Sequence, residues 1–311
     1  MKIESLDDME RALASIRKDL EERKGDPASI SQSLENCRRD WEAFLKTLAK
    51  RRAEPDVYDY LEMAKRVSSK AKKREYLEKA KALAPDNMEV LEYLYFLDAP
   101  KDPQTRLKIY EDLLKKGREF LVKDGMYEES KGHFGDVFET RPFMNVMVGY
   151  MELLIGYSMY GKAIEVGEEM LKLGPSDHQG IRYNLMSLYA FLGDKDRALK
   201  VAERYKEEAS EGTCFLLPLA ILYFKEGDFK KAGELVKRLK KNNKDFKAFV
   251  NLVVREEWGE IPTGGYDYAP DTLDELGMFF ELLPGLMMDN SAFFQWAKEQ
   301  MIVHRKPKTK K

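Results

Sequence analysis

The stretch LYAFLGDKDRA at residues 188–198 returns 34 residues later as LYFKEGDFKKA at residues 222–232, and this recurrence determines the predicted architecture. Leucine, tyrosine, glycine, aspartate and alanine occupy the same offsets in both stretches. A weaker copy lies 35 residues upstream, where Ser158 stands in the glycine position and Ala163 in the alanine position. Similarity at a fixed period of this length is typical of proteins built from repeated structural units.

The recurring residues predict two helices joined by a tight turn. Leucine and tyrosine fall on the apolar face of a first helix, glycine permits a left-handed exit from it, and aspartate caps the helix that follows. The alanine lets the second helix approach the first closely. We therefore expect hairpins of helices that bury their apolar faces against neighbouring hairpins.

These features resemble the tetratricopeptide repeat, a helix–turn–helix unit of about 34 residues. The resemblance is strong between Met144 and Phe246 and weaker outside. It implies an all-α fold, a right-handed superhelix (α-solenoid) of stacked tetratricopeptide-like helix hairpins with helical caps at both ends. The units are expected at about 54–86, 87–118, 144–178, 179–212 and 213–246, with a degenerate one from residue 247.

A closer resemblance lies in ETRPFM at residues 139–144 and DHQGIRY at residues 177–183. These segments are similar to a bacterial subgroup of tetratricopeptide proteins, in which an E-T-R-P-Y-M segment precedes a repeat and an N-D-N-Q-G-I-R-Y segment joins it to the next. Phe143 and His178 depart from that pattern. The subgroup implies an architecture and carries no activity with it.

Three regions are expected along the chain. Residues 1–52 form an N-terminal helical hairpin or cap, residues 53–260 the repeats, and residues 261–311 a loop, C-terminal capping helices and a basic tail. The N-terminal hairpin is interpreted as a cover for the first repeat, with self-association as the alternative. The tail, Arg305 to Lys311, holds five basic residues and is interpreted as solvated.

Composition limits the partners and the compartment. The 53 basic and 55 acidic residues leave a net charge of -2, which gives no broad attraction to nucleic acid or membrane without excluding a local patch. The acidic start does not resemble a secretory signal, and Cys37 and Cys214 fall in separate regions, so we expect a cytoplasmic protein. The apolar residues 143–161 carry Glu152 near their middle, which argues against a membrane span.

The motifs predict no cofactor, no metal site and no enzyme. His133, His178 and His304 show no paired metal spacing, and no C-x-x-C occurs. Cys214 begins an apolar stretch and is interpreted as a buried thiol rather than a nucleophile.

One polar segment stands out, at residues 139–142. Arg141 and Arg182 are expected to pair with Glu139 where two repeats join. An anion-binding role for the two arginines is a second interpretation. An enzyme with its site near Glu139, Arg141 and His133 is the least favoured reading of this segment.

The resemblance implies that ligands contact fixed positions on the first helix of each repeat. The predicted partner-binding groove consists of Asn145, Val148, Glu152, Tyr183, Ser187, Leu217, Ile221, Phe224, Asn251 and Arg255. These residues do not match the lysine and asparagine pattern of chaperone-binding members. We therefore expect a protein–protein interaction scaffold that binds a peptide or helix of a partner through apolar anchors.

Two other arrangements stay open at this point. An RNA-binding helical repeat needs a basic inner wall, and Arg255 alone qualifies among the groove residues, so nucleic acid is not favoured as a partner. Alternatively, the last helix, with Phe293 and Trp296 as anchors, occupies the groove itself in an autoinhibited state.

Overall fold

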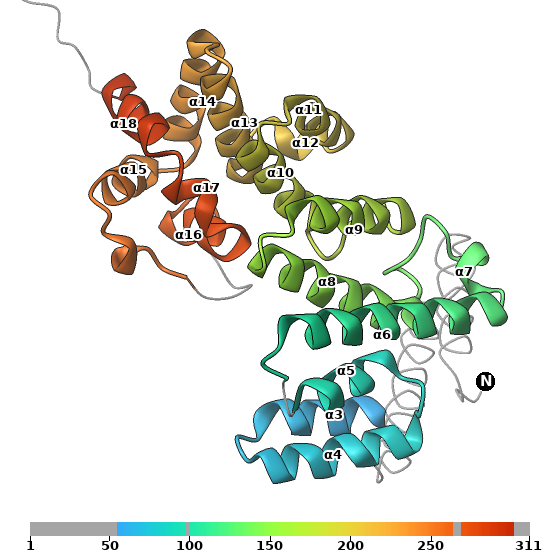
Figure 1. The fold of residues 1–311 in the computed structure, drawn as a ribbon. Coiled ribbons are helices and arrows are strands. Elements are labelled where there is room, and N and C mark those ends of the chain that lie inside the picture. The colour runs from blue at the N-terminus through green and yellow to red at the C-terminus, as the bar shows by residue number, and fades with distance from the viewer. Residues whose placement is uncertain (1–54, 98–99, 264–268, 302–311) are drawn as a thin grey trace, which may run out of the picture. The chain divides into compact units, whose positions relative to one another are not determined.

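The computed structural model describes residues 55–97, 100–263 and 269–301, and all regular secondary structure within these ranges is helical (Figure 1). The all-α prediction is therefore confirmed for the described part of the chain. The N-terminal hairpin expected at residues 1–52 and the basic tail lie outside it. The chain divides into two compact units, Met1–Asp98 and Ala99–Lys311.

The described part of the first unit holds α3 (Val57–Arg66), α4 (Lys70–Leu83) and α5 (Met88–Leu97). A capping box at Asp56 begins α3, and the Ser69 side chain caps α4. Successive helices contact each other. Their shared core is fully or almost fully buried and consists of Leu61, Ala64, Leu77, Ala80 and Val90.

The second unit contains the strong repeats. Its helices are α6 (Pro103–Lys123), α7 (Met126–Glu129), α8 (Arg141–Gly156), α9 (Tyr160–Leu173), α10 (Ile181–Leu192), α11 (Lys195–Arg204), α12 (Lys206–Ala209), α13 (Thr213–Lys225), α14 (Phe229–Asn242), α15 (Phe246–Val254), α16 (Leu273–Leu282), α17 (Pro284–Met288) and α18 (Ser291–Gln300). The repeat expected at residues 87–118 falls across the boundary between the two units, because α5 lies in the first and α6 in the second. None of the helices described combines the length and apolar character that crossing a bilayer requires.

Four helix ends in this unit share one turn geometry. The residue that leaves the helix has a positive φ in each, and the next N–H donates to the carbonyl five residues back, which is the Schellman arrangement. The left-handed residues are Ser158 (56°), Gly193 (80°), Gly227 (78°) and Glu256 (59°). The sequence predicted this exit for the glycines and placed Ser158 in the same position. Glu256 extends the pattern to the end of α15.

The remaining repeat residues take their expected places. Asp194 Oδ1 accepts from the Arg197 N–H at 3.1 Å, and Asp228 Oδ1 accepts from the Lys231 N–H at 3.1 Å, so each aspartate caps a second helix. The recurring alanines are fully buried at the helix crossings, and they are Ala163, Ala198 and Ala232.

Consecutive hairpins of the second unit lie against each other, with contacts of α9 to α10, α10 to α13 and α14 to α15. Side chains reach across these junctions to backbone carbonyls. Lys225 Nζ donates to the carbonyl of Phe191 at 2.7 Å, and the Tyr205 hydroxyl donates to the carbonyl of Pro175 at 3.0 Å. The stacking of neighbours is thus observed, whereas the superhelix and its handedness stay predictions.

A loop before α8 packs on the end of α9. The Phe134 N–H donates to the Leu173 carbonyl at 3.0 Å, and the buried Phe134 ring meets the Phe143 ring edge to face. Gly174 permits this approach, because a Cβ placed there lies 2.3 Å from the Phe134 carbonyl oxygen. The packing of this loop against the α8–α9 hairpin therefore requires a residue without a side chain at position 174.

We predict that Gly174→Ala lowers the free energy of unfolding by about 1–3 kcal/mol, since the added methyl forces the backbone of the loop to move. Urea denaturation measures the loss. Gly161→Ala is the matched control, because no atom lies within 4 Å of a Cβ at that helical position. Equal effects of the two substitutions contradict the prediction.

Candidate binding surface

The structure separates the ten predicted groove residues into an enclosed and an accessible set. Ser187, Leu217 and Ile221 are fully buried. Tyr183 and Phe224 are half-buried, and their rings are held by side chains of the same chain. The accessible set has intermediate or high exposure and consists of Asn145, Val148, Glu152, Asn251 and Arg255. The predicted groove is consequently not one continuous open surface.

Helices α16 and α17 pack against α10 and α13, the two helices that carry the middle part of the predicted groove. The α16 helix contacts α10, α13 and α15, and α17 contacts α10 (Figure 1). A Cβ built on Gly285 of α17 comes within 3.1 Å of the Phe191 ring of α10. The two helices bury five apolar side chains, which are Leu276, Phe279, Leu283, Leu286 and Met287.

Local contacts hold the beginning of α16. The Thr272 hydroxyl accepts from the Asp274 N–H at 3.2 Å. The buried Glu275 carboxylate reaches back to the Asp271 N–H at 2.9 Å and accepts from Asn243 Nδ2 at 3.3 Å. Burial raises the pKa of Glu275 despite these hydrogen bonds. This carboxylate thus anchors α16 to the residue that follows α14.

Phe224 packs on the last helix. Its ring centroid lies 5.6 Å from that of Phe293 and 5.1 Å from that of Trp296. For this one groove residue, the occupant is therefore the anchor pair that the sequence suggested. The rest of the covered surface is occupied by α16 and α17, which the sequence analysis treated only as capping helices.

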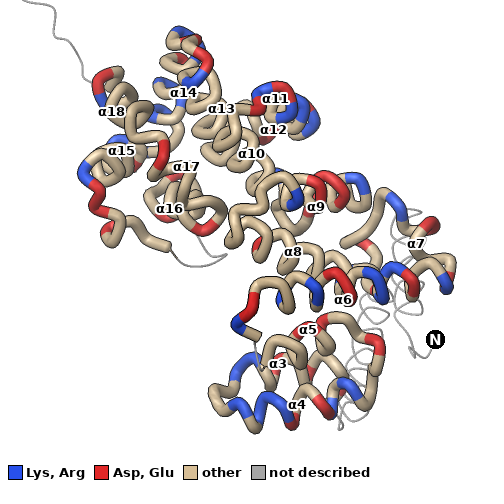
Figure 2. The backbone as a smooth tube through the Cα atoms, viewed as in Figure 1, with Lys and Arg blue, Asp and Glu red and all other residues tan. Residues whose placement is uncertain are grey.

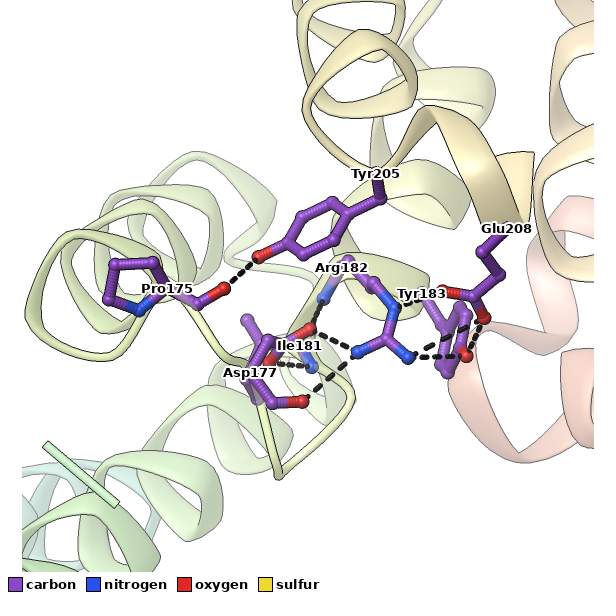
Figure 3. A network of polar contacts seen from close by, with 7 residues as sticks. All are labelled: Pro175, Asp177, Ile181, Arg182, Tyr183, Tyr205 and Glu208. Carbon is purple, nitrogen blue, oxygen red and sulfur yellow. Dashed lines mark hydrogen bonds and ion pairs between the residues drawn. The ribbon is translucent and has the colours of Figure 1, made fainter. Parts of the chain in front are cut away.

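A buried ionic network fixes the start of α10 (Figure 3). Asp177 has a φ of 50°, and its carboxylate accepts from the N–H groups of Ile181 at 2.8 Å and Arg182 at 2.9 Å. Arg182 Nη1 donates to Asp177 Oδ2 at 2.9 Å, and Arg182 Nε donates to Glu208 Oε2 at 2.8 Å. Burial raises the pKa of Asp177, and the hydrogen bonds to Arg182 oppose that rise.

Tyr183 belongs to this network and does not face an open groove. Its hydroxyl donates to Glu208 and accepts from Arg182 Nη2 at 2.7 Å, and the Arg182 Cζ lies 4.3 Å from the ring centroid. Burial and the bond to Glu208 raise the pKa of Tyr183. The side chain therefore links α10 to α12.

In the segment at residues 139–142, the Arg141 side chain donates to a backbone carbonyl and not to a carboxylate. Arg141 Nε donates to the Gly135 carbonyl at 2.8 Å, and Arg182 pairs with Asp177 and Glu208. Glu139 is exposed and forms no ion pair with any residue described. The expected pairing of both arginines with Glu139 is therefore not found, because nearer acceptors take both side chains.

Two histidines from different loops lie beside Asp136, His133 from the loop before α8 and His178 from the loop between α9 and α10. His178 Nε2 lies 2.5 Å from Asp136 Oδ1, and His133 Nδ1 lies 3.8 Å from Asp136 Oδ2. The hydrogen bond from His178 lowers the pKa of Asp136. Within the described ranges, no three His, Cys, Asp or Glu side chains are arranged to hold a metal ion.

Cys214 matches its predicted role as a structural thiol. It lies buried at the start of α13, and burial raises the pKa of its thiol. Because the thiolate is the nucleophilic form, this environment suppresses reactivity.

The largest accessible group of predicted residues lies on α8. Asn145, Val148 and Glu152 follow each other at helical spacing, and Gly149 and Gly156 share the same side of the helix. Glu152 is exposed to solvent, yet desolvation by the surrounding protein raises its pKa.

Comparison of the chain with models of protein families, with curated proteins and with solved structures finds no match. The site must accordingly be interpreted from its own geometry.

We predict that Arg182→Met lowers the free energy of unfolding by about 3 kcal/mol, because it leaves the Asp177 carboxylate buried without its counter-charge. Asp177→Asn in the same chain restores part of the loss, since asparagine tolerates the positive φ and removes the charge. A double-mutant cycle in urea measures the coupling.

Arg197→Met is the control for that cycle. Arg197 pairs with Asp194 at 2.6 Å in a more exposed setting, where an ion pair contributes less than about 1 kcal/mol. If Arg182→Met costs no more than Arg197→Met, the network does not stabilise the start of α10.

Proposed function

We propose that this protein is a binding scaffold that holds a segment of a partner protein against the open face of α8. The face is defined by Asn145, Val148, Gly149, Glu152 and Ile155. The observation that carries the proposal is the contrast between this face, which is accessible, and the corresponding surface of α10 and α13, which the chain covers with its own α16 and α17.

The composition of the α8 face specifies the partner's chemistry. Val148 and Ile155 are half-buried apolar side chains that offer contacts to an apolar anchor. Glu152 gives this face a negative charge, which favours a lysine or arginine of the partner between its apolar anchors. Gly149 has no side chain to keep a partner backbone away. A short helix or extended segment with apolar and basic residues meets these conditions.

The tetratricopeptide-like interpretation supports the same function. Four turns of one geometry and buried alanines at the helix crossings are what that kind of unit requires. Asn251 and Arg255 on α15 offer a second accessible position of the predicted groove. Leu217 and Ile221 are fully buried, so a partner reaches them only if part of the chain is displaced. Binding in the cytoplasm is part of this proposal.

Display of a random peptide library on the immobilised protein tests the proposal. We expect the selected peptides to combine apolar residues with lysine or arginine, and Val148→Arg to weaken their binding at least tenfold by occupying the face with a repelling charge. Val122→Arg is the matched control, because Val122 is exposed on α6. Peptides that bind both variants equally well, or no selected peptides, contradict the assignment.

The proposed pairing with Glu152 predicts a pH dependence. Desolvation raises the pKa of Glu152 above its ordinary 4.5, so this carboxylate loses its charge at a higher pH than an exposed glutamate does. Affinity for a basic peptide should therefore fall as the pH is lowered from 7 to 5. Titration calorimetry measures the change. Glu152→Gln should bind more weakly at pH 7 and lose the dependence, and an unchanged profile argues against the pairing.

A further inference from the structure

The segment around α14 is strongly basic, whereas the chain as a whole is close to neutral. Residues 228–247 hold eight lysines and arginines against three carboxylates, in a protein whose net charge is -2 (Figure 2). The apolar side of the helix, with Leu235, Val236 and Leu239, is buried in the protein. The charged side is thus the part of α14 that meets solvent.

Four lysines of this segment are exposed. Lys230, Lys237 and Lys241 recur at spacings of seven and four residues, which places them along one face of α14. At 1.5 Å per residue these three span about 17 Å. Lys244 is exposed in the turn that follows the helix. Among the described residues, no carboxylate forms an ion pair with Lys237, Lys241 or Lys244. Their charge is available to an external anion.

The end of α18 lies beside this face, because Lys240 Nζ donates to the carbonyl of Met301 at 3.4 Å. Five basic residues follow later in the sequence, at Arg305–Lys311.

An exposed aromatic ring lies at the other end of the lysine row. Phe229 is 53% exposed, and its ring centroid lies 5.5 Å from that of Phe224 and 5.9 Å from that of Trp296. The ring is therefore supported from behind and accessible to a planar ligand. Aromatic platforms beside a basic track are how proteins bind single strands of nucleic acid without regard to sequence.

Two other anionic partners fit this surface less well. A membrane-surface helix inserts its apolar side into the lipid, and that side of α14 is already buried in the protein. An acidic protein segment would add apolar anchors to its charged contacts, whereas the exposed residues of α14 between Lys230 and Lys241 are charged. Phosphates spaced along a flexible strand match a row of separated ammonium groups.

We propose that the exposed face of α14 and the turn after it bind single-stranded RNA or DNA. Lys237 and Lys241 of the helix and Lys244 of the turn contact the phosphates, and Phe229 stacks on a base. Lysine neutralises phosphate as a point charge and reads no base edge, so the binding is independent of sequence. This surface is separate from the α8 face, and its function does not rest on the peptide binding proposed above.

Fluorescence anisotropy of labelled 20-nucleotide single strands of RNA and of DNA, titrated with the full chain between about 50 and 200 mM KCl, tests the proposal. We expect Lys237→Gln with Lys241→Gln and Lys244→Gln to weaken binding at least tenfold. The slope of log K against log salt should decrease by about 2, because three phosphate contacts are lost. Phe229→Leu, which keeps an apolar side chain, should weaken binding about tenfold without changing the slope.

The charge-matched control is Lys72→Gln with Lys81→Gln and Lys116→Gln, three exposed lysines of α4 and α6. It should bind as the unaltered chain does. Four outcomes overturn the proposal: no binding at 100 mM salt, equal losses in the two triple variants, tighter binding of a duplex of the same length, and preferred binding to polyglutamate or to vesicles with 30% anionic lipid. Circular dichroism confirms that each variant is folded.

Discussion

Each hairpin between residues 141 and 254 depends on a reversal of direction made by a single left-handed residue. The N–H that follows this residue bonds to a carbonyl five residues back, so the first helix ends at a fixed place and the second begins at a fixed angle. Only then do Ala163, Ala198 and Ala232 meet the facing helix closely enough to be fully buried. Ser158 and Glu256 adopt the same conformation at a cost of about 1–2 kcal/mol each, which the packing of the hairpins must offset.

Local chemistry explains why these features were predictable. A glycine followed by aspartate specifies a turn and a cap within five residues of sequence, and the buried alanines follow at a constant offset. Contacts between residues far apart in the sequence were not predictable in this way. Arg182 pairs with Glu208, which lies 26 residues away in sequence, and that pairing depends on where α12 comes to lie.

The covering of α10 and α13 by α16 and α17 was missed for a related reason. Residues 273–288 are apolar on more than one side, which indicates burial but does not say against which helix. The predicted groove residues carried a signal of their own. Leu217 and Ile221 continue an almost wholly apolar α13, and a helix that is apolar all round is more typical of a buried element than of one open wall.

When each unit of a repeat protein contacts only its neighbours, the protein can unfold one unit at a time, from its ends inwards. The α16 helix alters that behaviour, because it touches α10, α13 and α15 together and so joins hairpins that otherwise meet only in pairs. Residues 181–254 should consequently open as one cooperative block. In the described part of the chain, the α8–α9 hairpin is not among the elements that α16 contacts closely. We therefore expect the hairpin that carries the proposed binding face to open separately from that block.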